Sequence, residues 1–414
     1  MKKLIPQSIK NIYHLFQAVL ANLIYGFPSK NIKVIGVTGT NGKTTTCQMT
    51  VRILEEAGYK AAMASTINFK LGDKEWVNTT KFTTLSPFAV QKFLKQAVEA
   101  GCDYAVLETS SHSLDQYRVW GIDYKVAVIT NVTREHLDYH KTMERYRQAK
   151  LKLFKKAGTS VVNLDMEKPE DFLQYENKKK KTYSLKDKRA DIFARNIHLE
   201  NSNSTFEIDN QKFYLNLAGD FNVENALAAV AVGTAESVNL DDCVKALADI
   251  KGVPGRMEKV PNRKGLDIII DYAVTPDSLE KLYALLEDIN SQKARIIAVF
   301  GSCGERDRGK RPIMGEIVSR HADFVIVTNE DPYGEDPMQI IEEVAGGVKG
   351  KKENENFWKI LDRRAAIGKA LQIAKPGDFV VVTGKGAEET MAVGDQRIPW
   401  NDKKVILEEL EKVE

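Results

Sequence analysis

The sequence predicts an α/β fold with mainly parallel sheets, divided into more than one domain. Apolar runs that suit buried strands alternate with segments of helical periodicity, which is the pattern of parallel α/β sheets. The chain has 414 residues, enough for two or three domains with large cores. Gly252, Pro254 and Gly255 interrupt the pattern and indicate a hinge. We expect an N-terminal helical segment over 1–30, a central domain over 31–254 and a C-terminal domain over 255–414.

The first segment predicts one amphipathic helix. Residues 11–29 contain no Lys, Arg, Asp or Glu, but polar residues interrupt the run, and Gly26 and Pro28 end it. We expect its apolar face to pack on the first domain, with weak contact between residues 4–27 and a membrane surface as the alternative. The apolar residues at helical spacing are Ile9, Ile12, Leu15, Phe16, Val19, Leu20 and Leu23.

The central and C-terminal segments both alternate strands with helices. A polar insert over 70–78 predicts a hairpin, and the highly charged segment 166–190, with Lys178–Lys181 at its centre, predicts a solvated loop rather than a partner-binding patch. Short β segments follow as far as Leu217. The expected strands are 32–37, 60–65, 103–108, 125–131, 160–164, 267–272, 295–300, 323–328 and 378–383, and the expected helices include 44–57, 86–100, 141–156, 222–236 and 240–249.

Composition excludes some classes of function. The formal net charge is +3, from 60 basic and 57 acidic residues, so the concentrated basic surface of a nucleic-acid-binding protein is not expected. Four scattered cysteines contain no C-x-x-C pair, which favours a reducing, cytoplasmic location over a disulfide framework or a zinc ribbon.

The segment Gly39-Thr40-Asn41-Gly42-Lys43-Thr44-Thr45 has the features of a phosphate-binding loop. It follows an apolar strand and opens a predicted helix, although its spacing differs from G-x-x-x-x-G-K-[ST]. Glycines allow the backbone N–H groups to face phosphate oxygens, and the helix N-terminus adds partial positive charge. Lys43 would contact the β- and γ-phosphates and Thr44 would hold Mg²⁺. An ordinary glycine turn is the alternative. The phosphate loop predicts that the central domain is of the P-loop ATPase type. The alternating strands and helices of the C-terminal domain predict that it is Rossmann-like.

Two polar residues follow neighbouring strands of the same predicted sheet. Glu108 ends the strand 103–108, where a carboxylate can bind Mg²⁺ beside Thr44. His136 follows the next strand and is a candidate ligand of a second metal ion. The alternatives are a polar strand end for Glu108 and an ordinary hydrogen-bonding role for His136.

From about Ile32 to the C-terminus, the chain resembles the Mur ligase family and most closely its MurE branch, the ATP-dependent synthetases that add the third amino acid to UDP-N-acetylmuramoyl-dipeptide. Each motif is weak alone, but their joint order is specific. They are GTNGKTT (39–45), Thr83-Thr84, ETSSHSLDQYR (108–118), NVTREHLDYH (131–140), YRQAK (146–150), GDFNVEN (219–225), GRME (255–258), DYAVTPD (271–277), FGSCGERD (300–307), KRP (310–312), DRR (362–364) and GKG (384–386).

The resemblance implies roles for individual residues. Lys43, Thr44, Glu108, His136 and Lys150 would be catalytic or bind Mg²⁺, with Lys150 carbamylated by CO₂, because a carbamate is an anionic oxygen ligand and an ammonium is not. Without the resemblance, Lys150 would pass for a solvated helix lysine. The resemblance also implies that Asn225, Arg256 and Asp271 bind nucleotide, that Thr83, Thr84, Ser110, Gln116 and Arg118 bind the muramoyl-peptide acceptor, and that Arg306, Asp331, Tyr333, Gly384 and Glu388 bind the amino acid.

The reaction implied is ATP-dependent amide-bond formation through an acyl phosphate, as in peptidoglycan precursor synthesis, by an enzyme expected to be a monomer.

Three departures from the family pattern stand out. Only about 38 residues precede the phosphate loop, so no uridine-nucleotide-binding domain is expected and the acceptor's carrier, UDP or lipid, stays open. Glu330-Asp331-Pro332-Tyr333 stands where diaminopimelate-adding enzymes have D-N-P-R, which favours lysine or another diamine. Val274 and Ala387 replace two family histidines.

Two other functions fit the sequence. One is a related ligase for another acceptor, such as folylpolyglutamate, a pseudomurein peptide or a lipid-linked precursor, which the short N-terminus favours. The other is a non-catalytic nucleotide-binding subunit. Retention of Lys43, Thr44, Glu108, His136 and Lys150 argues against the second.

Overall fold

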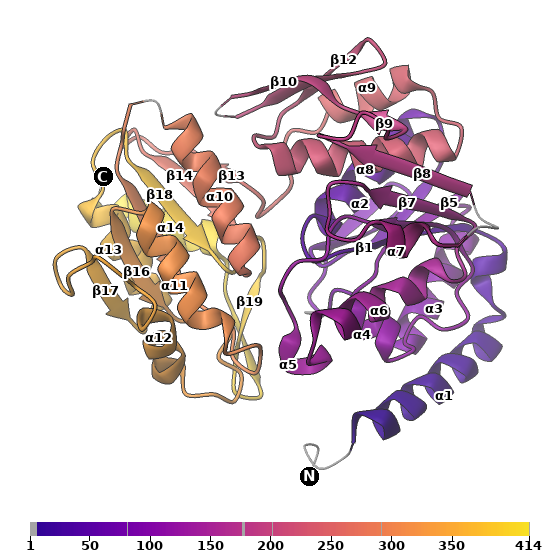
Figure 1. Ribbon diagram of the computed structural model, residues 1–414. Coiled ribbons are helices and arrows are strands. Elements are labelled where there is room, and N and C mark those ends of the chain that lie inside the picture. Colours follow the sequence, from indigo (N-terminus) through magenta and orange to yellow (C-terminus); the bar gives the residue numbers. More distant parts are fainter. Residues whose placement is uncertain (1–5, 81, 176–178, 201, 291, 414) are drawn as a thin grey trace. The chain divides into compact units, whose positions relative to one another are not determined.

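A computed structural model describes residues 6–413 except 81, 176–178, 201 and 291. The chain divides into two compact units (Figure 1). The first contains Met1–Val132 and Thr142–Lys251, and the second contains Thr133–Lys141 and Gly252–Glu414. The short segment Thr133–Lys141, which carries His136, therefore belongs to the second unit. The three-part domain division stays a prediction, whereas the α/β class with a mainly parallel sheet is confirmed.

The first unit is built on a nine-stranded sheet with the order β4-β3-β2-β5-β1-β6-β7-β8-β9. β3 pairs antiparallel with both β2 and β4, and the other neighbours pair in parallel. β3 and β4 form the hairpin predicted over 70–78. This order places β1, which precedes the phosphate loop, between β5 and β6. The strands are β1 (Lys33–Thr38), β2 (Ala61–Ala64), β3 (Asn68–Leu71), β4 (Lys74–Val77), β5 (Tyr104–Glu108), β6 (Tyr124–Ile129), β7 (Thr159–Asn163), β8 (Lys179–Ser184) and β9 (Ile192–Phe193).

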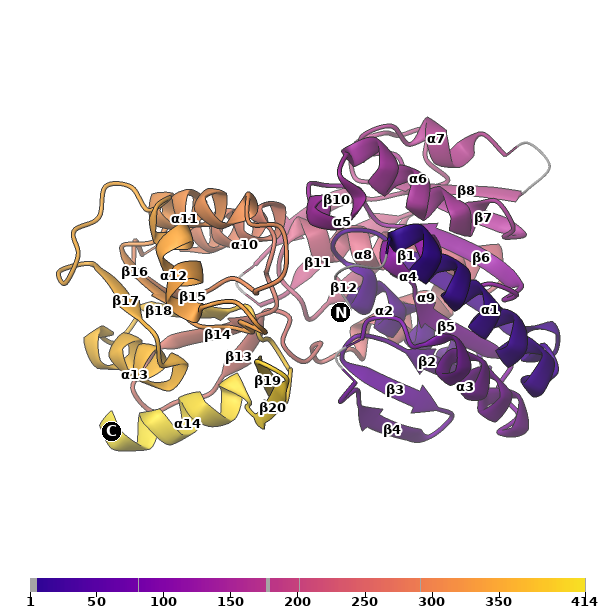
Figure 2. The ribbon, with the colours of Figure 1, turned by 90° about the horizontal axis from the view of Figure 1, so that it is seen from below.

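Helices cover both faces of this sheet because its central strands are apolar on both sides. α2 packs with α8 and α9 (Figure 2). α3 and α6 contribute Phe93, Leu94 and Phe154 to a core that includes Leu107 and Ile129. The helices are α1 (Gln7–Tyr25), the 3₁₀ turn η2 (Pro28–Lys30), α2 (Lys43–Glu56), α3 (Pro87–Glu99), α4 (Ser111–Asp115), α6 (Met143–Phe154), α7 (Glu170–Leu173), α8 (Asp220–Ala235) and α9 (Leu240–Ala248).

The expectation of a solvated loop over 166–190 is wrong in part. Lys179–Lys181 belong to β8, which pairs with β7 and β9, while Lys178 lies outside the described residues. Lys179 and Lys180 are nevertheless exposed, so their charge stays in water while the backbone completes the sheet. The short β segments predicted up to Leu217 form a separate antiparallel sheet of β10 (Arg195–Leu199), β11 (Ser204–Ile208) and β12 (Gln211–Leu215).

The N-terminal helix is confirmed as α1, but its predicted orientation is wrong. Only Ala18, Ala21 and Asn22 are buried, and Ile9, Ile12 and most of the apolar stripe face outward. Within the described part of the chain, no helix is long and apolar enough to cross a membrane.

The second unit contains a six-stranded sheet with the order β13-β14-β18-β15-β16-β17, parallel except for β13 at one edge. β17 was not predicted from the sequence, because its side chains are mostly half-buried and do not alternate clearly. A buried ion pair between Arg363 and Asp402 joins the last helix to this core. The elements are α5 (Leu137–His140), β13 (Glu258–Val260), β14 (Asp267–Asp271), α10 (Pro276–Ile289), β15 (Ile296–Phe300), α11 (Lys310–His321), β16 (Phe324–Thr328), α12 (Pro337–Ala345), β17 (Phe357–Ile360), α13 (Arg363–Ile373), β18 (Phe379–Thr383), β19 (Thr390–Val393), β20 (Gln396–Pro399) and α14 (Asp402–Val413).

Candidate active site

The predicted phosphate loop lies between β1 and α2, as its sequence indicated. α2 begins at Lys43, and Gly42 caps it in a left-handed conformation with φ of 82°. The Lys43 ammonium donates to the carbonyl of Thr40 at 2.8 Å, so the side chain folds back over its own loop. Thr45 is buried in the first turn of α2. The loop therefore presents a lysine and a helix N-terminus together, which suits an anionic phosphate chain.

Three residues that the sequence analysis did not select hold this loop. The backbone carbonyl of Asn131 accepts from the backbone N–H of Thr40 at 3.0 Å. The side-chain Oδ1 of Asn131 accepts from the backbone N–H of Asn41 at 2.9 Å. The Thr130 hydroxyl donates to the Asn41 carbonyl at 2.6 Å. The Tyr146 hydroxyl lies 3.2 Å from Thr40 Oγ1. Asn131 and Tyr146 open two of the family motifs but were assigned no role, and Thr130 lies outside those motifs, because their contacts with the loop form only when the sheet assembles.

Asn225, a predicted nucleotide-binding residue, lies against the phosphate loop. A Cβ atom at Gly42 would meet Asn225 Oδ1 at 2.2 Å, so only glycine fits there with this packing. Asn225 Oδ1 also accepts from the Thr46 hydroxyl at 3.4 Å. α8 thus places a side-chain amide at the start of α2, more than 170 residues later in the chain.

Thr44 and Glu108 form the centre of the site. The Thr44 hydroxyl donates to Glu108 Oε2 at 2.9 Å, and both residues are buried. Thr66, which the sequence analysis missed, donates to Glu108 through its backbone N–H at 2.8 Å and its hydroxyl at 2.9 Å. A hydroxyl beside a carboxylate supplies the hard oxygen ligands that Mg²⁺ prefers. The described residues contain no cluster of three or more His, Cys, Asp or Glu that could hold a metal ion.

Four of the five predicted acceptor-binding residues form one hydrogen-bonded chain next to Glu108. The Thr83 hydroxyl lies 3.1 Å from the Thr66 hydroxyl and can donate to it, and the Thr84 hydroxyl donates to the Glu108 carbonyl at 2.9 Å. Thr84 Oγ1 accepts from the backbone N–H of Ser110 at 2.9 Å, and its carbonyl accepts from Arg118 at 2.8 Å. The fifth residue, Gln116, lies one residue beyond α4, where its backbone N–H donates to the His112 carbonyl.

Lys150 is buried in α6, with 1% of its surface exposed. Its Nζ atom lies 4.4 Å from the ring centre of Tyr146, whose hydroxyl contacts the phosphate loop. Burial, with a further contribution from the charge of Lys43, lowers the pKa of Lys150 well below its ordinary value. A neutral amine is the form that reacts with CO₂, so this environment fits the predicted carbamate.

His136 belongs to the second unit, where it precedes α5 with φ of 57°. Its Nδ1 atom is 3.9 Å from Glu135, a buried carboxylate. Lys310, also buried, donates to Glu135 at 2.9 Å and to the Val274 carbonyl at 2.7 Å. A backbone carbonyl needs no particular side chain, so the valine at position 274 leaves this contact intact.

The predicted nucleotide residues of the second unit lie together. The Arg256 guanidinium is 4.6 Å from the ring centre of Tyr272, and Asp271 accepts from the backbone N–H of Met257 at 2.8 Å. Burial raises the pKa of Asp271, while the charge of Arg256 opposes that shift. The carbonyl of Asp271 accepts from the N–H of Gly384 at 3.2 Å, which links this group to the predicted amino-acid residues.

Asp331 has a cationic partner within the chain. Lys385 donates to both oxygens of Asp331, at 2.8 and 2.9 Å, and to Glu388 at 2.5 Å. The backbone N–H of Ala392 adds a further bond to Asp331 at 2.7 Å. One lysine thus faces two carboxylates, those of Asp331 and Glu388. Asp331 does not cap a helix, because Asp336 caps α12, and its predicted role toward a substrate ammonium stays a prediction.

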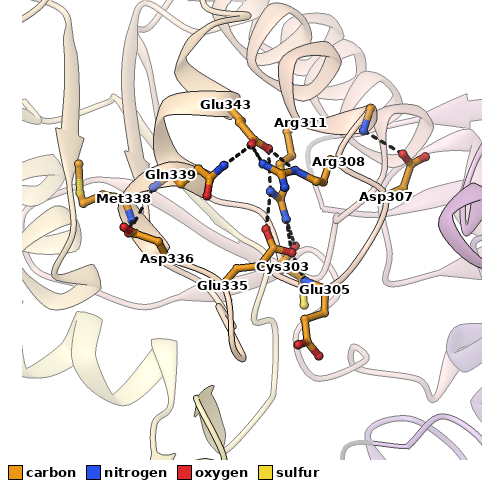
Figure 3. Close-up of polar contacts among 11 residues, drawn as sticks. Cys303, Glu305, Asp307, Arg308, Arg311, Glu335, Asp336, Met338, Gln339 and Glu343 are labelled. Atoms are coloured by element: carbon orange, nitrogen blue, oxygen red, sulfur yellow. Dashed lines mark hydrogen bonds and ion pairs between the residues drawn. The ribbon is translucent and has the colours of Figure 1, made fainter. Parts of the chain in front are cut away.

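A polar network holds the loops that carry Arg306 and Tyr333. Arg311 is fully buried and donates to Glu335 at 2.9 Å and to Glu343 at 2.7 Å. Figure 3 shows Arg308 and Arg311 converging on Glu343. Glu335 also accepts from the backbone N–H of Glu305 at 2.5 Å, next to Arg306. Arg306 itself lies 5.6 Å from the ring centre of Tyr333.

Glu330, which the sequence analysis passed over, is the most perturbed carboxyl of this region. It is 4% exposed, and its Oε2 atom has no hydrogen-bond partner among the described residues. A Cβ atom at Gly384 would meet Oε2 at 2.8 Å. Burial and the neighbouring charge of Asp331 raise the pKa of Glu330 to about 7, although Lys385 and Arg363 oppose the shift.

This carboxyl should make stability depend on pH. Because the pKa is higher in the folded protein than in the unfolded chain, the folded state binds the proton more tightly, and the free energy of unfolding falls as pH rises from about 4.5 to about 7. We expect Glu330→Gln to remove about 3 kcal/mol of this decline, measured by urea unfolding at several pH values. Glu167→Gln, at an exposed glutamate, should leave the pH profile unchanged. Parallel profiles for Glu330→Gln and the parent would contradict the assignment.

A parallel sheet with a phosphate loop after a central strand, an adjacent buried carboxylate and a buried lysine defines a nucleotide-dependent enzyme. Two family models match the chain: the Mur ligase middle domain over residues 37–233 and the Mur ligase, glutamate ligase domain over residues 255–386. The chain belongs to the Mur ligase family, whose members are ATP-dependent acid–amino-acid ligases.

Relatives at higher identity agree with this assignment. The UDP-N-acetylmuramoyl-L-alanyl-D-glutamate–2,6-diaminopimelate ligase of Clostridium botulinum is 40% identical over 402 residues, which are 96% of this chain and 81% of the relative. The UDP-N-acetylmuramyl-tripeptide synthetase of Roseiflexus is 40% identical over 408 residues, 93% and 80% of the two chains. A solved diaminopimelate ligase structure is 32% identical, with a TM-score of 0.62 and coverage of 92% and 79%.

More distant structures share the fold alone. A folylpolyglutamate synthase of Mycobacterium tuberculosis is 17% identical with a TM-score of 0.71, over 89% of this chain and 91% of that one. A pseudomurein peptide ligase of Methanothermus fervidus is 21% identical with a TM-score of 0.66, over 92% and 79%. At these identities the likeness carries no information on the acceptor.

Proposed function

We propose that this protein is a MurE-like ligase that joins an amino acid to the terminal carboxylate of a muramoyl-peptide acceptor, with ATP converted to ADP and phosphate, in peptidoglycan precursor synthesis. The observation that carries the proposal is the hydrogen bond from Thr44 to Glu108. It joins the phosphate loop to the chain of hydroxyls formed by Thr83, Thr84 and Ser110. The functions printed for the relatives at about 40% identity support the same reaction.

In the proposed reaction, the acceptor's carboxylate attacks the γ-phosphate of ATP and forms an acyl phosphate as ADP leaves. The amine of the incoming amino acid then attacks the acyl carbon, and phosphate leaves as the amide forms. Lys43 and the loop N–H groups would bind the phosphates, and Lys43 would neutralise part of their negative charge. Arg118, Thr84 and Ser110 would orient the acceptor. Asn225 contacts the nucleotide side of the loop, and Arg256 and Asp271 are proposed to bind the rest of the nucleotide.

The residues present fit Mg²⁺ beside the phosphates. Thr44, Glu108 and the carbamate of Lys150 would hold the ion, which would neutralise phosphate charge. Carbamate formation joins the neutral Lys150 amine to CO₂ and releases one proton. His136 stays a predicted ligand of a second ion. We also infer that the protein is a cytoplasmic monomer that does not bind nucleic acid.

We further propose that the added amino acid is lysine or another diamine without a distal carboxylate, in contrast to the diaminopimelate named for several relatives. The support is that Tyr333, and not an arginine, stands beside Arg306. Arg306, Gly384 and Glu388 would bind the common α-amino and α-carboxylate groups. The unpartnered oxygen of buried Glu330 is an additional candidate to meet an ammonium group.

Tyr333→Arg tests this selectivity. The guanidinium would supply a bidentate partner for a distal carboxylate, so kcat/KM for diaminopimelate relative to lysine should rise at least about 10-fold. Tyr333→Gln, which has no charge, should leave the ratio near its starting value. Amino-acid-dependent phosphate release measures both. Preference of the unmodified protein for diaminopimelate would refute the lysine proposal without affecting the ligase proposal.

The ligase function is tested by product analysis. The protein is incubated with ATP, Mg²⁺, mixed amino acids and a muramoyl dipeptide, supplied in one arm on UDP and in another on a lipid carrier. Mass spectrometry should detect the acceptor extended by one amino acid in at least one arm, and that arm identifies the carrier. Phosphate release that no amino acid stimulates, without any extended product, would overturn the proposal.

A further inference from the structure

The N-terminal helix α1 attaches to the first unit through its small and polar side chains. Ala18 and Ala21 are fully or almost fully buried, and the amide of Asn22 donates to the carbonyl of Trp120 at 2.9 Å. Near the other end, Asn11 donates to the carbonyl of Asp115 at 3.2 Å. Figure 2 shows α1 beside α3 on this unit. The side of the helix that faces the protein is therefore the less apolar one.

The large apolar side chains of α1 face outward, and we call this set the α1 apolar face. Their exposed fractions are between 38% and 66%, and they recur every three or four residues, so they form one stripe. A continuous stripe of this size is unusual on a free protein surface and indicates a binding surface. Its members are Ile9, Ile12, Tyr13, Phe16, Leu20, Leu23 and Ile24.

The charges of the N-terminal segment are all positive. Residues 1–54 contain six lysines and one arginine but no Asp or Glu, whereas the whole chain is nearly balanced. Lys10 is partly exposed near the start of α1, and Lys30 is exposed just beyond its end. Asp115, the acidic residue that Asn11 contacts, is paired with Lys152 at 2.7 Å. The α1 apolar face thus has a lysine near each of its ends.

We propose that the α1 apolar face docks on an anionic lipid bilayer, with α1 lying in the interface plane. Aliphatic and aromatic side chains would enter the headgroup region while Lys10 and Lys30 meet anionic headgroups. A second copy of this chain fits less well, because two segments without acidic residues would bring like charges together.

The test uses the full chain, without nucleotide, and flotation with vesicles of phosphatidylcholine containing about 30% phosphatidylglycerol or none. We expect binding to the anionic vesicles that weakens with added salt, and much weaker binding to the neutral ones. The double substitution Ile12→Gln and Phe16→Gln should reduce binding at least about 10-fold. Both side chains are exposed, so the fold should survive, as circular dichroism can verify.

The matched control is the double substitution Leu199→Gln and Tyr214→Gln, at two exposed apolar side chains of β10 and β12. It should bind like the parent protein. Absence of binding to anionic vesicles, or equal binding by both double variants, would overturn the proposal. The proposal would also be overturned if the parent protein formed a concentration-dependent dimer and did not bind vesicles, and if the Ile12→Gln and Phe16→Gln double variant, but not the control variant, disrupted that dimer. Because the assay requires no catalysis, its outcome is independent of the ligase proposal.

Discussion

Replacing Lys150 with alanine should reduce amino-acid-dependent phosphate release by about 10³-fold, because the proposed carbamate ligand cannot form. The physical basis is the burial of the Lys150 amine beside Tyr146 and the nearby charge of Lys43, which together lower its pKa and favour the nucleophilic neutral form. Steady-state assays with saturating ATP and acceptor measure the loss. Nuclear magnetic resonance with ¹³C-labelled CO₂ should detect a carbamate signal in the parent protein that Lys150→Ala lacks.

Two comparisons separate this chemistry from a packing defect. Lys156→Ala, just beyond the same helix, removes a lysine near Trp120 and should keep nearly full activity. Formate or acetate should partly restore Lys150→Ala, because a small carboxylate can occupy the space of the missing carbamate, whereas a repacked or unfolded site would not respond. The carbamate would be ruled out if the parent protein stayed active without CO₂ and the Lys150→Ala variant was also active.

Replacing Asp402 with asparagine should lower the free energy of unfolding of the second unit by about 3–5 kcal/mol, because it leaves the buried Arg363 guanidinium without its counter-charge. Arg363 Nε donates to Asp402 Oδ1 at 2.9 Å and Nη2 donates to Oδ2 at 2.7 Å. The indole N–H of Trp400 donates to the same carboxylate at 2.8 Å. Urea unfolding, followed by circular dichroism, measures the change.

An exposed ion pair supplies the control. Lys352 and Glu355 lie in contact on the surface, so Glu355→Gln should cost at most about 1 kcal/mol. Replacing both Arg363 and Asp402 by apolar residues should cost less than the sum of the single substitutions, because no unpaired charge stays behind. A loss for Asp402→Asn no larger than that for Glu355→Gln would contradict the buried-pair argument.

Much of the fold was predictable because its signals are local. The strand, glycine loop and helix around Lys43 follow one another within the sequence, and β1 and α2 form where expected. Strands with weak local signals were missed: β8 has consecutive lysines, and β17 has no clear alternation, yet each pairs with a neighbouring strand. Pairing with a neighbouring strand can outweigh a weak β-propensity. Which strands pair cannot be seen in the local sequence of either strand.

The sequence by itself determined the α/β class, the phosphate loop and the order of motifs that mark the family, because all three depend on neighbouring residues or their order. Only the tertiary structure decided that Thr66, Thr130 and Asn131 support the site, that Lys385 pairs with Asp331, and that α1 turns its apolar side outward. The physical reason is that burial and hydrogen bonding between distant segments set charge, pKa and exposure. Those contacts exist only once the sheets have assembled.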